Sequence, residues 1–308
     1  MATTSRRRLI RVNDLSDAAL AELFARARAF ETGEALPGGR LQGRFVVNLF
    51  YENSTRTRVS FEVAAKRLGA EVVNVTPAGT SVAKGESLVD TVRTIEANGP
   101  DVIVFRHQDS GAPEVIERET KAAVINAGDG SRGHPTQALL DAMTLQSTLQ
   151  RERLDGLMVA MVGDVIHSRV ARSNMDLLPR LGARVRLVGP SCFVADGFRD
   201  LGFEVAHDLE EGLRGCDVVM MLRVQLERHQ GVSFGSTREY HRRYGLTKER
   251  LDRCAPQAWV MHPGPTNRGV EMTDEVMDDP RCLVRSQVEH GMFVRMAALD
   301  MLVSGGAA

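Results

Sequence analysis

Three hydroxyl and two guanidinium side chains stand in one short run between a segment typical of a buried strand, 44–50, and one typical of a helix, 55–68. Ligands of a parallel sheet bind outside the carboxyl ends of its strands. The free N–H groups and the positive dipole end of a helix attract anions, and arginine adds bidentate contacts to phosphate. An ordinary helix cap is the alternative, but two arginines in a first turn are unfavourable there. The run therefore predicts a phosphate site at Ser54, Thr55, Arg56, Thr57 and Arg58.

A histidine and a glutamine lie three residues apart at the start of another expected helix, 134–149, which also follows a strand-like segment. At this spacing the side chains of His134 and Gln137 can reach one ligand, and Pro135 suits the first helical position. A histidine at a helix N-terminus tends to stay neutral and can donate a hydrogen bond to a carbonyl oxygen that gains charge. A loop histidine bonded only to backbone is the alternative that these residues leave open.

The turn after the expected strand 157–162 does not match a dinucleotide site, and the chain has no P-loop. Residues 161–164 carry one glycine where a dinucleotide site needs G-x-G-x-x-G, and G-x-x-x-x-G-K-[ST] does not occur. The cysteines are widely spaced and have no histidine at metal-ligand spacing, so we expect buried free thiols without disulfides or zinc. We therefore expect no cofactor and no metal. The cysteines are Cys192, Cys216, Cys254 and Cys282.

The charges of the chain balance almost completely. Lysine and arginine number 39 and aspartate and glutamate 40, which gives a formal net charge of −1. Such a balance is not typical of proteins that bind nucleic acid or anionic membranes through charge. No apolar run approaches the roughly 20 residues that span a bilayer, and the basic N-terminus lacks the apolar segment of a secretory signal. We expect a cytoplasmic protein with no nucleic-acid or membrane partner.

Strand and helix patterns alternate along almost the whole chain, which is typical of parallel sheets covered by helices. We predict an α/β fold of two doubly wound domains, each a parallel sheet flanked by helices. Residues 1–150 with 287–308 form the first domain and 151–286 the second, and the helix expected at 287–303 returns to the first. The expected strands are 44–50, 71–75, 101–105, 122–125, 157–162, 184–188, 217–221 and 259–261.

Five short motifs, taken together, resemble those of the carbamoyltransferases in order and rough spacing. Over nearly its whole length the chain resembles the aspartate carbamoyltransferase family. Ornithine carbamoyltransferases share two of the motifs, but their late motif reads His-Cys-Leu-Pro, and this chain has Pro263 where that thiol would be. The motifs are Ser54-Thr55-Arg56-Thr57-Arg58, Arg106-His107, His134-Pro135-Thr136-Gln137, Arg223-Val224-Gln225 and His262-Pro263-Gly264-Pro265.

This resemblance implies roles for individual residues in binding carbamoyl phosphate. The phosphate cradle would consist of Ser54, Thr55, Arg56 and Thr57. The donors to the carbonyl oxygen would be Thr57, Arg106 and His134. The carbamoyl NH₂ group would be held by Gln137 and by the backbone around Pro263, Gly264 and Pro265.

The resemblance also implies how aspartate is bound and how subunits share the site. The guanidinium group of arginine can make two parallel hydrogen bonds to a carboxylate, which the ammonium group of lysine cannot. The aspartate-binding residues would be Arg169, Arg223 and Gln225 together with Lys84. Ser81 and Lys84 match a loop that reaches the neighbouring subunit of a homotrimer, although a solvated loop lysine is the alternative. Glu52, with Arg228 and Arg169, resembles a bridge that favours domain closure.

The activity that the resemblance implies is direct transfer of the carbamoyl group from carbamoyl phosphate to L-aspartate, an early committed step toward pyrimidines. Neither metal nor covalent enzyme intermediate would take part. A carbamoyltransferase for another amino acceptor, such as ornithine, is one alternative, and a non-catalytic sensor of phosphate ligands on the same fold is another. A regulatory chain or dihydroorotase is a possible partner that the sequence leaves open.

Overall fold

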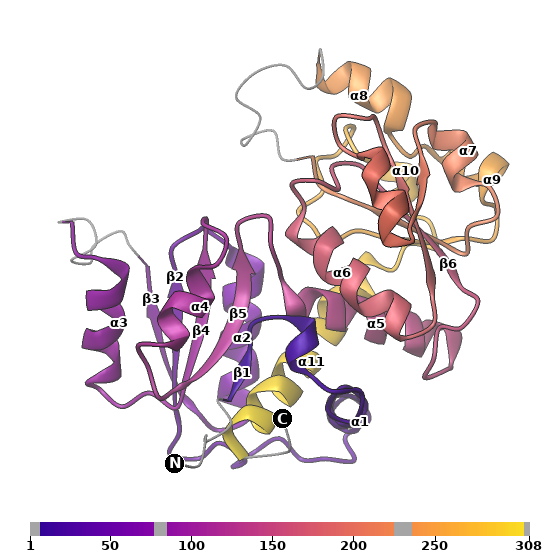
Figure 1. Ribbon diagram of the computed structural model, residues 1–308. Helices are drawn as coiled ribbons and strands as arrows, with labels where there is room; N and C mark the ends of the chain where they lie inside the picture. Colours follow the sequence, from indigo (N-terminus) through magenta and orange to yellow (C-terminus); the bar gives the residue numbers. More distant parts are fainter. Residues whose placement is uncertain (1–6, 77–84, 225–235, 305–308) are drawn as a thin grey trace. The chain divides into compact units, whose positions relative to one another are not determined.

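The computed structural model describes residues 7–76, 85–224 and 236–304 of the chain. The chain forms two compact units, one of residues 1–143 with 289–308 and the other of residues 144–288. The two boundaries between them fall within two long helices, α5 (Pro135–Leu149) and α11 (Val284–Ser304). Each unit contains its own five-stranded sheet (Figure 1).

The sheet of the first unit is parallel throughout, in the order β1-β5-β4-β2-β3. Its central strands are almost continuously apolar, as in FVVNLF of β2, because helices cover both faces of the sheet. The strands are β1 (Arg8–Leu9), β2 (Phe45–Phe50), β3 (Glu71–Val75), β4 (Val102–His107) and β5 (Ala123–Asp129).

Helices lie on both faces of this sheet because the chain reverses direction across it. It passes from β2 outward to β3 and then crosses back to β4 and β5. Since such crossovers are right-handed, α2 covers one face while α3 and α4 cover the other, where Val92 and Ile116 pack against β2, β4 and β5. The helices are η1 (Val12–Asp14), α1 (Asp17–Thr32), α2 (Thr55–Arg67), α3 (Leu88–Glu96) and α4 (Ala112–Glu117).

The C-terminal helix α11 packs in the first unit, which confirms the expected return. Its buried Asp300 accepts hydrogen bonds from Arg26 of α1 at 2.7 Å and from Arg40 at 2.8 Å. Near the end of α11, the backbone oxygen of Val303 accepts a hydrogen bond from Arg7 at 3.1 Å. Buried charge pairs and backbone contacts therefore join both ends of the chain to one unit.

The second unit repeats the plan with the order β10-β9-β6-β7-β8, again parallel throughout. The chain passes from β6 to β7 and β8 and then crosses back to β9 and β10, so this sheet is doubly wound as well. The strands are β6 (Met158–Val162), β7 (Arg184–Val188), β8 (Glu204–Ala206), β9 (Val218–Met221) and β10 (Trp259–Met261).

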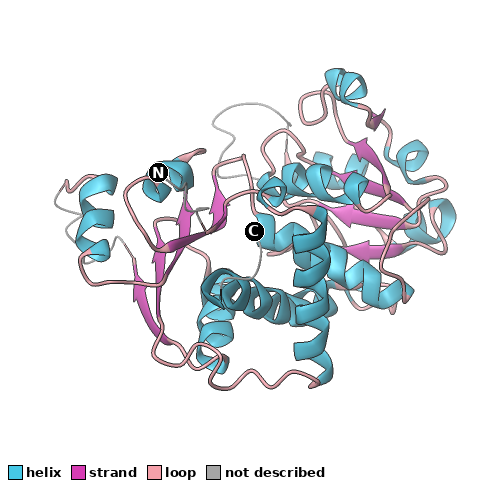
Figure 2. Cartoon of the chain, turned by 60° about the horizontal axis from the view of Figure 1, so that its bottom comes forward, coloured by secondary structure: helices cyan, strands magenta, loops and turns pink. Residues whose placement is uncertain are grey.

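The core of the second unit lies between its sheet and the helices that follow β8. Leu213 of α7, Tyr240 of α8 and Leu251 of α9 are buried against the central strands. Figure 2 shows the helices set around each sheet. The helices are α6 (Arg169–Arg180), η3 (Asp196–Leu201), α7 (Leu209–Leu213), α8 (Thr237–Tyr244), α9 (Lys248–Cys254) and α10 (Asp274–Met277).

These findings confirm the predicted class of two doubly wound parallel sheets. All eight expected strands occur, each close to its expected bounds. Two short edge strands, β1 and β8, were not predicted, because two or three residues carry no detectable alternation. The helices α7, α9 and α10 were not predicted either, because helices this short show no clear periodic pattern of apolar residues.

The expectation of four buried thiols is wrong for Cys192. That residue is exposed, because it lies in a surface turn after β7, whereas Cys216 and Cys254 are buried and Cys282 is half-buried. All four are free thiols. In the parts of the chain that the structure describes, no helix has the length and apolar character needed to cross a membrane.

Candidate functional site

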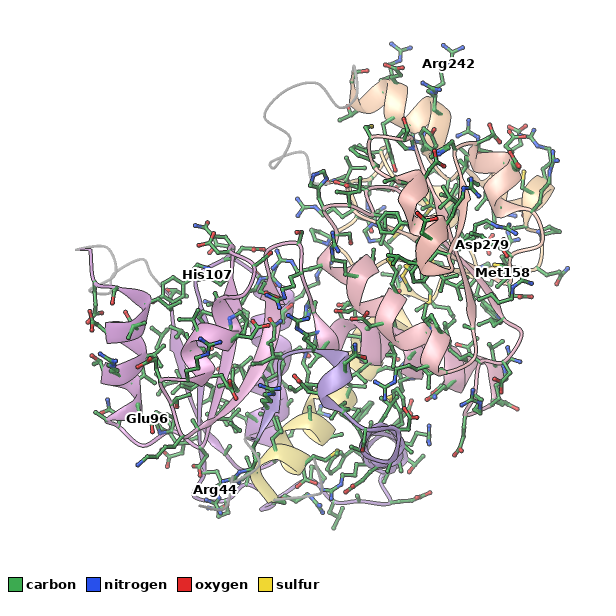
Figure 3. The ribbon with its side chains drawn as sticks, in the orientation of Figure 1. Arg44, Glu96, His107, Met158, Arg242 and Asp279 are labelled. Carbon is green, nitrogen blue, oxygen red and sulfur yellow. The ribbon has the colours of Figure 1, made fainter. Side chains whose placement is uncertain are left out.

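The first candidate site lies where the chain reverses direction in the first sheet. The carboxyl ends of β2 and β4 are neighbours there, with Phe50 opposite Arg106 in the register. Ligands of doubly wound sheets bind at such a point because the flanking loops diverge to opposite faces and leave a crevice. In Figure 3, His107 marks this end of the sheet, and Arg44 and Glu96 mark the opposite end.

The N-terminus of α2 supplies the hydroxyl groups of this site. Ser54 occupies the N-cap position, but its side chain makes no capping hydrogen bond, and the first turn contains no acidic residue. Thr57 is buried in that turn, whereas Thr55 and Arg56 are exposed. A helix end with an unused cap hydroxyl, no carboxylate and cationic side chains is suited to an anion.

Arg106 joins three parts of the site at the end of β4. Its Nη2 atom lies 2.6 Å from Oε1 of Glu52, just after β2, and its Nη1 atom donates to the backbone oxygen of Ala127 in β5 at 2.9 Å. The side chain is only 11% exposed. A charged hydrogen bond on one side and a carbonyl on the other fix the plane of the guanidinium.

Two buried polar side chains shape the loop between β5 and α5. Asn126 donates to the backbone oxygen of Ile10 at 3.0 Å and to Asp129 at 2.8 Å, and the other oxygen of Asp129 accepts from the backbone N–H of Gly111 at 2.8 Å. This network holds the loop that ends at His134, which is buried immediately before α5. The position of His134 is thus set from outside its own helix.

Gln137 lies in the first turn of α5 and its amide is already bonded. Its Nε2 atom donates to Oδ1 of Asp141, one turn further on, at 2.9 Å. Asp141 is completely buried, while Gln137 is slightly exposed. The carbonyl oxygen of Gln137 is the end of the amide that remains for a ligand with N–H groups.

Aromatic rings surround His107 at the edge of this site. The ring stacks on Phe105 and lies 5.1 Å from the ring of Tyr51, centre to centre. Burial lowers the pKa of His107, so the ring is neutral at pH 7. Its Nδ1 atom accepts a hydrogen bond from the backbone N–H of Asp109, which leaves the proton on Nε2.

The second unit has its own reversal point, between β6 and β9. Arg169 begins α6 after β6 and is buried, and Arg223 follows β9 and is half-buried. Gly163 follows β6 with a φ of +126°, and a Cβ there would lie 3.0 Å from the hydroxyl oxygen of Tyr240. Both arginines therefore lie where a parallel sheet binds ligands.

A buried carboxylate connects the segment after β9 to the loop after β10. Glu271 accepts hydrogen bonds from the backbone N–H groups of Val224 at 3.0 Å and Asn267 at 2.7 Å, and burial raises its pKa. In the same loop His262 accepts the N–H of Gly264 at 2.8 Å, and the Gly264–Pro265 peptide is cis. Glu271 thus links the segment after β9 to the loop after β10, and these two segments carry different sequence motifs.

The predicted residues that the structure describes fall into two groups, one in each unit. Glu52, residues 54–57, Arg106, His134 and Gln137 belong to the first unit, and Arg169, Arg223 and residues 263–265 to the second. Four predicted residues lie outside the described residues, namely Ser81, Lys84, Gln225 and Arg228. The pairing of Glu52 with Arg106 was not anticipated, although Glu52 follows β2 and Arg106 lies near the end of the neighbouring strand β4.

The supporting polar residues Asn126, Asp129, Asp141 and Glu271 were missed as well. Their signal in the sequence is weak, because each is a single polar residue whose burial depends on distant segments. Across residues 7–76, 85–224 and 236–304, no cluster of three or more histidine, cysteine, aspartate or glutamate side chains is arranged to hold a metal ion.

Two family models match the chain, one for each half. Residues 7–147 match the carbamoyl-P binding domain of aspartate/ornithine carbamoyltransferase, and residues 155–302 match its Asp/Orn binding domain. The aspartate carbamoyltransferase catalytic subunit of Rhodospirillum rubrum is 56% identical over 263 residues, 85% of this chain and 82% of that protein. The one from Caulobacter vibrioides is 51% identical over 305 residues, 97% of this chain and 91% of its own length.

Solved structures show the same similarity. The Trypanosoma cruzi aspartate transcarbamoylase in complex with N-(phosphonacetyl)-L-aspartic acid has a TM-score of 0.86 at 33% identity, covering 97% of each chain. The catalytic subunit from M. jannaschii has a TM-score of 0.83 at 35% identity, covering 97% of this chain and 99% of its own. An ornithine carbamoyltransferase from Pyrococcus furiosus also matches, with a TM-score of 0.86 at 28% identity over 100% of both chains.

Proposed function

Because this chain belongs to the aspartate/ornithine carbamoyltransferase family, we propose that it transfers the carbamoyl group of carbamoyl phosphate to the α-amine of L-aspartate. The products are N-carbamoyl-L-aspartate and phosphate, and the reaction serves pyrimidine biosynthesis. Residues 1–150 with 287–308 bind carbamoyl phosphate and 151–286 bind aspartate. The protein acts in the cytoplasm.

The observation that carries this proposal is the arrangement around Arg106. A guanidinium fixed by Glu52 and by the backbone of Ala127 lies beside a helix N-terminus whose cap hydroxyl is unused. The phosphate binds to the side chains and N–H groups of residues 54–57. The carbonyl oxygen is then within reach of cationic and neutral donors, which is the arrangement that an acyl phosphate requires.

In the reaction, the aspartate nitrogen attacks the carbonyl carbon and a C–N bond forms. The carbonyl oxygen becomes an oxyanion, which hydrogen bonds from Thr57, Arg106 and His134 stabilise. Collapse of the intermediate breaks the bond from carbon to the phosphate oxygen. The departing phosphate takes the proton from the amine, so no residue has to act as a permanent base.

The charge of the second unit supports aspartate as the acceptor. Arg169 and Arg223 lie near the reversal point of its sheet, and two arginines match the two carboxylates of aspartate. Ornithine has an ammonium group where aspartate has its second carboxylate, and that group would be repelled. Gln225 completes the proposed aspartate set, with Lys84 from a neighbouring subunit.

We propose a homotrimer in which Ser81 and Lys84 enter the neighbouring active site. Glu52 would also bridge the two units through Arg228 and Arg169 when they close around both substrates. A native mass measurement tests whether a regulatory chain or dihydroorotase binds the trimer. A mass of three chains alone would argue against both partners.

The test is an assay of the purified protein with carbamoyl phosphate and either L-aspartate or L-ornithine, in which phosphate and carbamoylated product are both measured. We expect equal amounts of phosphate and N-carbamoyl-L-aspartate, and turnover with ornithine lower by about 100-fold or more. Preference for ornithine would overturn the acceptor. Binding of carbamoyl phosphate without turnover of either acceptor would favour the non-catalytic sensor.

A further inference from the structure

The amide of Gln137 has one orientation that its neighbour permits. Its Nε2 atom lies 2.9 Å from Oδ1 of Asp141, one turn along α5. An ionised carboxylate only accepts hydrogen bonds, so it must face the NH₂ end of the amide. With the amide reversed, two oxygen atoms would meet at hydrogen-bond distance inside the protein, where unpaired polar contacts are costly.

A buried arginine supports the negative charge of Asp141. Arg295 of α11 is 5% exposed, and burial lowers its pKa to about 10, an effect that the charge of Asp141 opposes. The attraction acts in both directions, so the guanidinium also stabilises the negative charge of Asp141.

The position of Arg295 is itself well defined. Its Nη1 atom donates to the hydroxyl of Ser60 in α2 at 2.7 Å and to the backbone oxygen of Gly291 at 3.0 Å, and the guanidinium lies 5.2 Å from the ring centre of Phe61. A Cβ at Gly291 would lie only 2.7 Å from Nη1. The absence of a side chain at 291 therefore makes room for the arginine between α11 and α2.

We propose that Asp141 is a positioning residue that makes the site select a carbamoyl group over an acetyl group, by turning the carbonyl oxygen of Gln137 toward the ligand. This inference rests on the proposed function. Carbamoyl phosphate and acetyl phosphate differ only in an NH₂ group where the other has a methyl. An oxygen held in place accepts from the NH₂ group, whereas a methyl group leaves that oxygen unpaired.

The test compares equilibrium binding of carbamoyl phosphate, acetyl phosphate and inorganic phosphate to the full-length protein by calorimetry. We expect the wild type to prefer carbamoyl over acetyl phosphate by about 10-fold or more, the value of one good hydrogen bond. Asp141→Leu removes the acceptor and should reduce this preference to about twofold, with affinities for acetyl phosphate and phosphate nearly unchanged. Asp141→Asn should keep part of the preference, because its amide oxygen can still accept from Nε2, whereas its NH₂ group can also turn and donate to the oxygen of Gln137.

Two further variants keep the test decisive. If Asp141→Leu does not fold, the double variant Asp141→Leu with Arg295→Met replaces both buried charges by apolar groups and should show the same loss of preference. Asp300→Leu is the matched control, since it removes another buried carboxylate of the same unit, paired with Arg26 and Arg40. It should lower stability without changing the preference.

The outcomes separate this inference from the proposed function. Equal weakening of all three ligands in Asp141→Leu would show a merely structural role and overturn the inference. An unchanged preference would overturn it as well, while the proposed function would stand. A wild type without any preference for the carbamoyl group would overturn both.

Discussion

At the scale of single residues, the side chains proposed for chemistry are held by buried polar neighbours. Arg106 is fixed by Glu52 and Ala127, and the loop before His134 is fixed by Asn126 and Asp129. These contacts are made by groups of the protein itself, so little reorganisation is needed when charge develops on the carbonyl oxygen. Donors placed in advance are the main source of transition-state stabilisation in such reactions.

We predict that His134→Ala slows turnover far more than it weakens binding of carbamoyl phosphate. A donor to the oxyanion acts mainly in the transition state, so kcat should fall by about 100-fold or more. Steady-state kinetics and calorimetry measure the two effects. His207→Ala is the control, because that ring contacts Gly189 and Asp196 of the second unit instead. An unchanged kcat with a raised KM would mean that His134 only positions substrate.

Arg223→Ala should affect the other substrate. Its place after β9 in the second unit predicts a KM for aspartate raised by about 10-fold or more, because a bidentate contact to a carboxylate is lost. Calorimetry should find binding of carbamoyl phosphate nearly intact. Equal losses for both ligands would contradict the assignment of one substrate to each unit.

At the scale of elements, the second unit uses ion pairs to fasten a short helix that has little core of its own. The buried Asp279, just after α10, accepts hydrogen bonds from Arg281 and lies 3.4 Å from Lys248 of α9. Arg281 also bonds Asp252 of α9. A helix of 7 residues cannot be stable by itself, so this cluster helps to define where α9 lies.

The same cluster gives a pH-dependent prediction. Hydrogen bonds from Arg281 hold the pKa of Asp279 well below its ordinary value. A depressed pKa in the folded state means that the stabilisation is present above about pH 4 and is lost as pH falls toward the folded pKa. Asp279→Asn should therefore lower the free energy of unfolding by about 2 kcal/mol at pH 7, and the difference from wild type should shrink below pH ~4.

Urea unfolding at a series of pH values measures this difference. The exposed neighbour Asp278 is the matched control, and Asp278→Asn should leave stability nearly unchanged at every pH. A difference for Asp279→Asn that stays constant from pH 7 down to pH ~3 would mean that the charge of Asp279 contributes nothing.

At the scale of the whole molecule, the proposed trimer predicts complementation between two inactive variants. Arg56→Ala and Lys84→Ala each remove one cation from every site, so each trimer should be nearly inactive alone. In a closed ring, Arg56 of one chain faces Lys84 of the next in a fixed direction. Any mixed trimer then contains one junction at which both cations are present.

Random mixing in equal amounts makes about three quarters of the trimers mixed, each with one restored site in three, so about one quarter of wild-type activity should return. Each variant is dissociated and reassembled alone as the control, and subunit exchange is verified by mass. Recovery no greater than the sum of the parents would show that Lys84 serves its own chain.

The class of fold and eight of its strands were predictable from the amino-acid sequence, which also predicts a phosphate-binding turn at residues 54–57. These features depend on local patterns. Apolar runs such as 45–50 fit buried parallel strands, and two arginines in the first turn of α2 conflict with the helix dipole unless an anion binds there. The return of the C-terminal helix also followed from its apolar spacing. Motif resemblance then supplied the roles that local patterns do not reveal.

Which side chains support one another depends on how the chain folds. Glu52 meets Arg106, Asp141 lies near Arg295, and Glu271 joins Val224 to Asn267, although most of these partners are far apart in the sequence. The physical reason is burial. A lone polar residue in an apolar stretch looks the same whether it is solvated or enclosed, and its partner becomes defined only when packing removes water and leaves no other group to satisfy it.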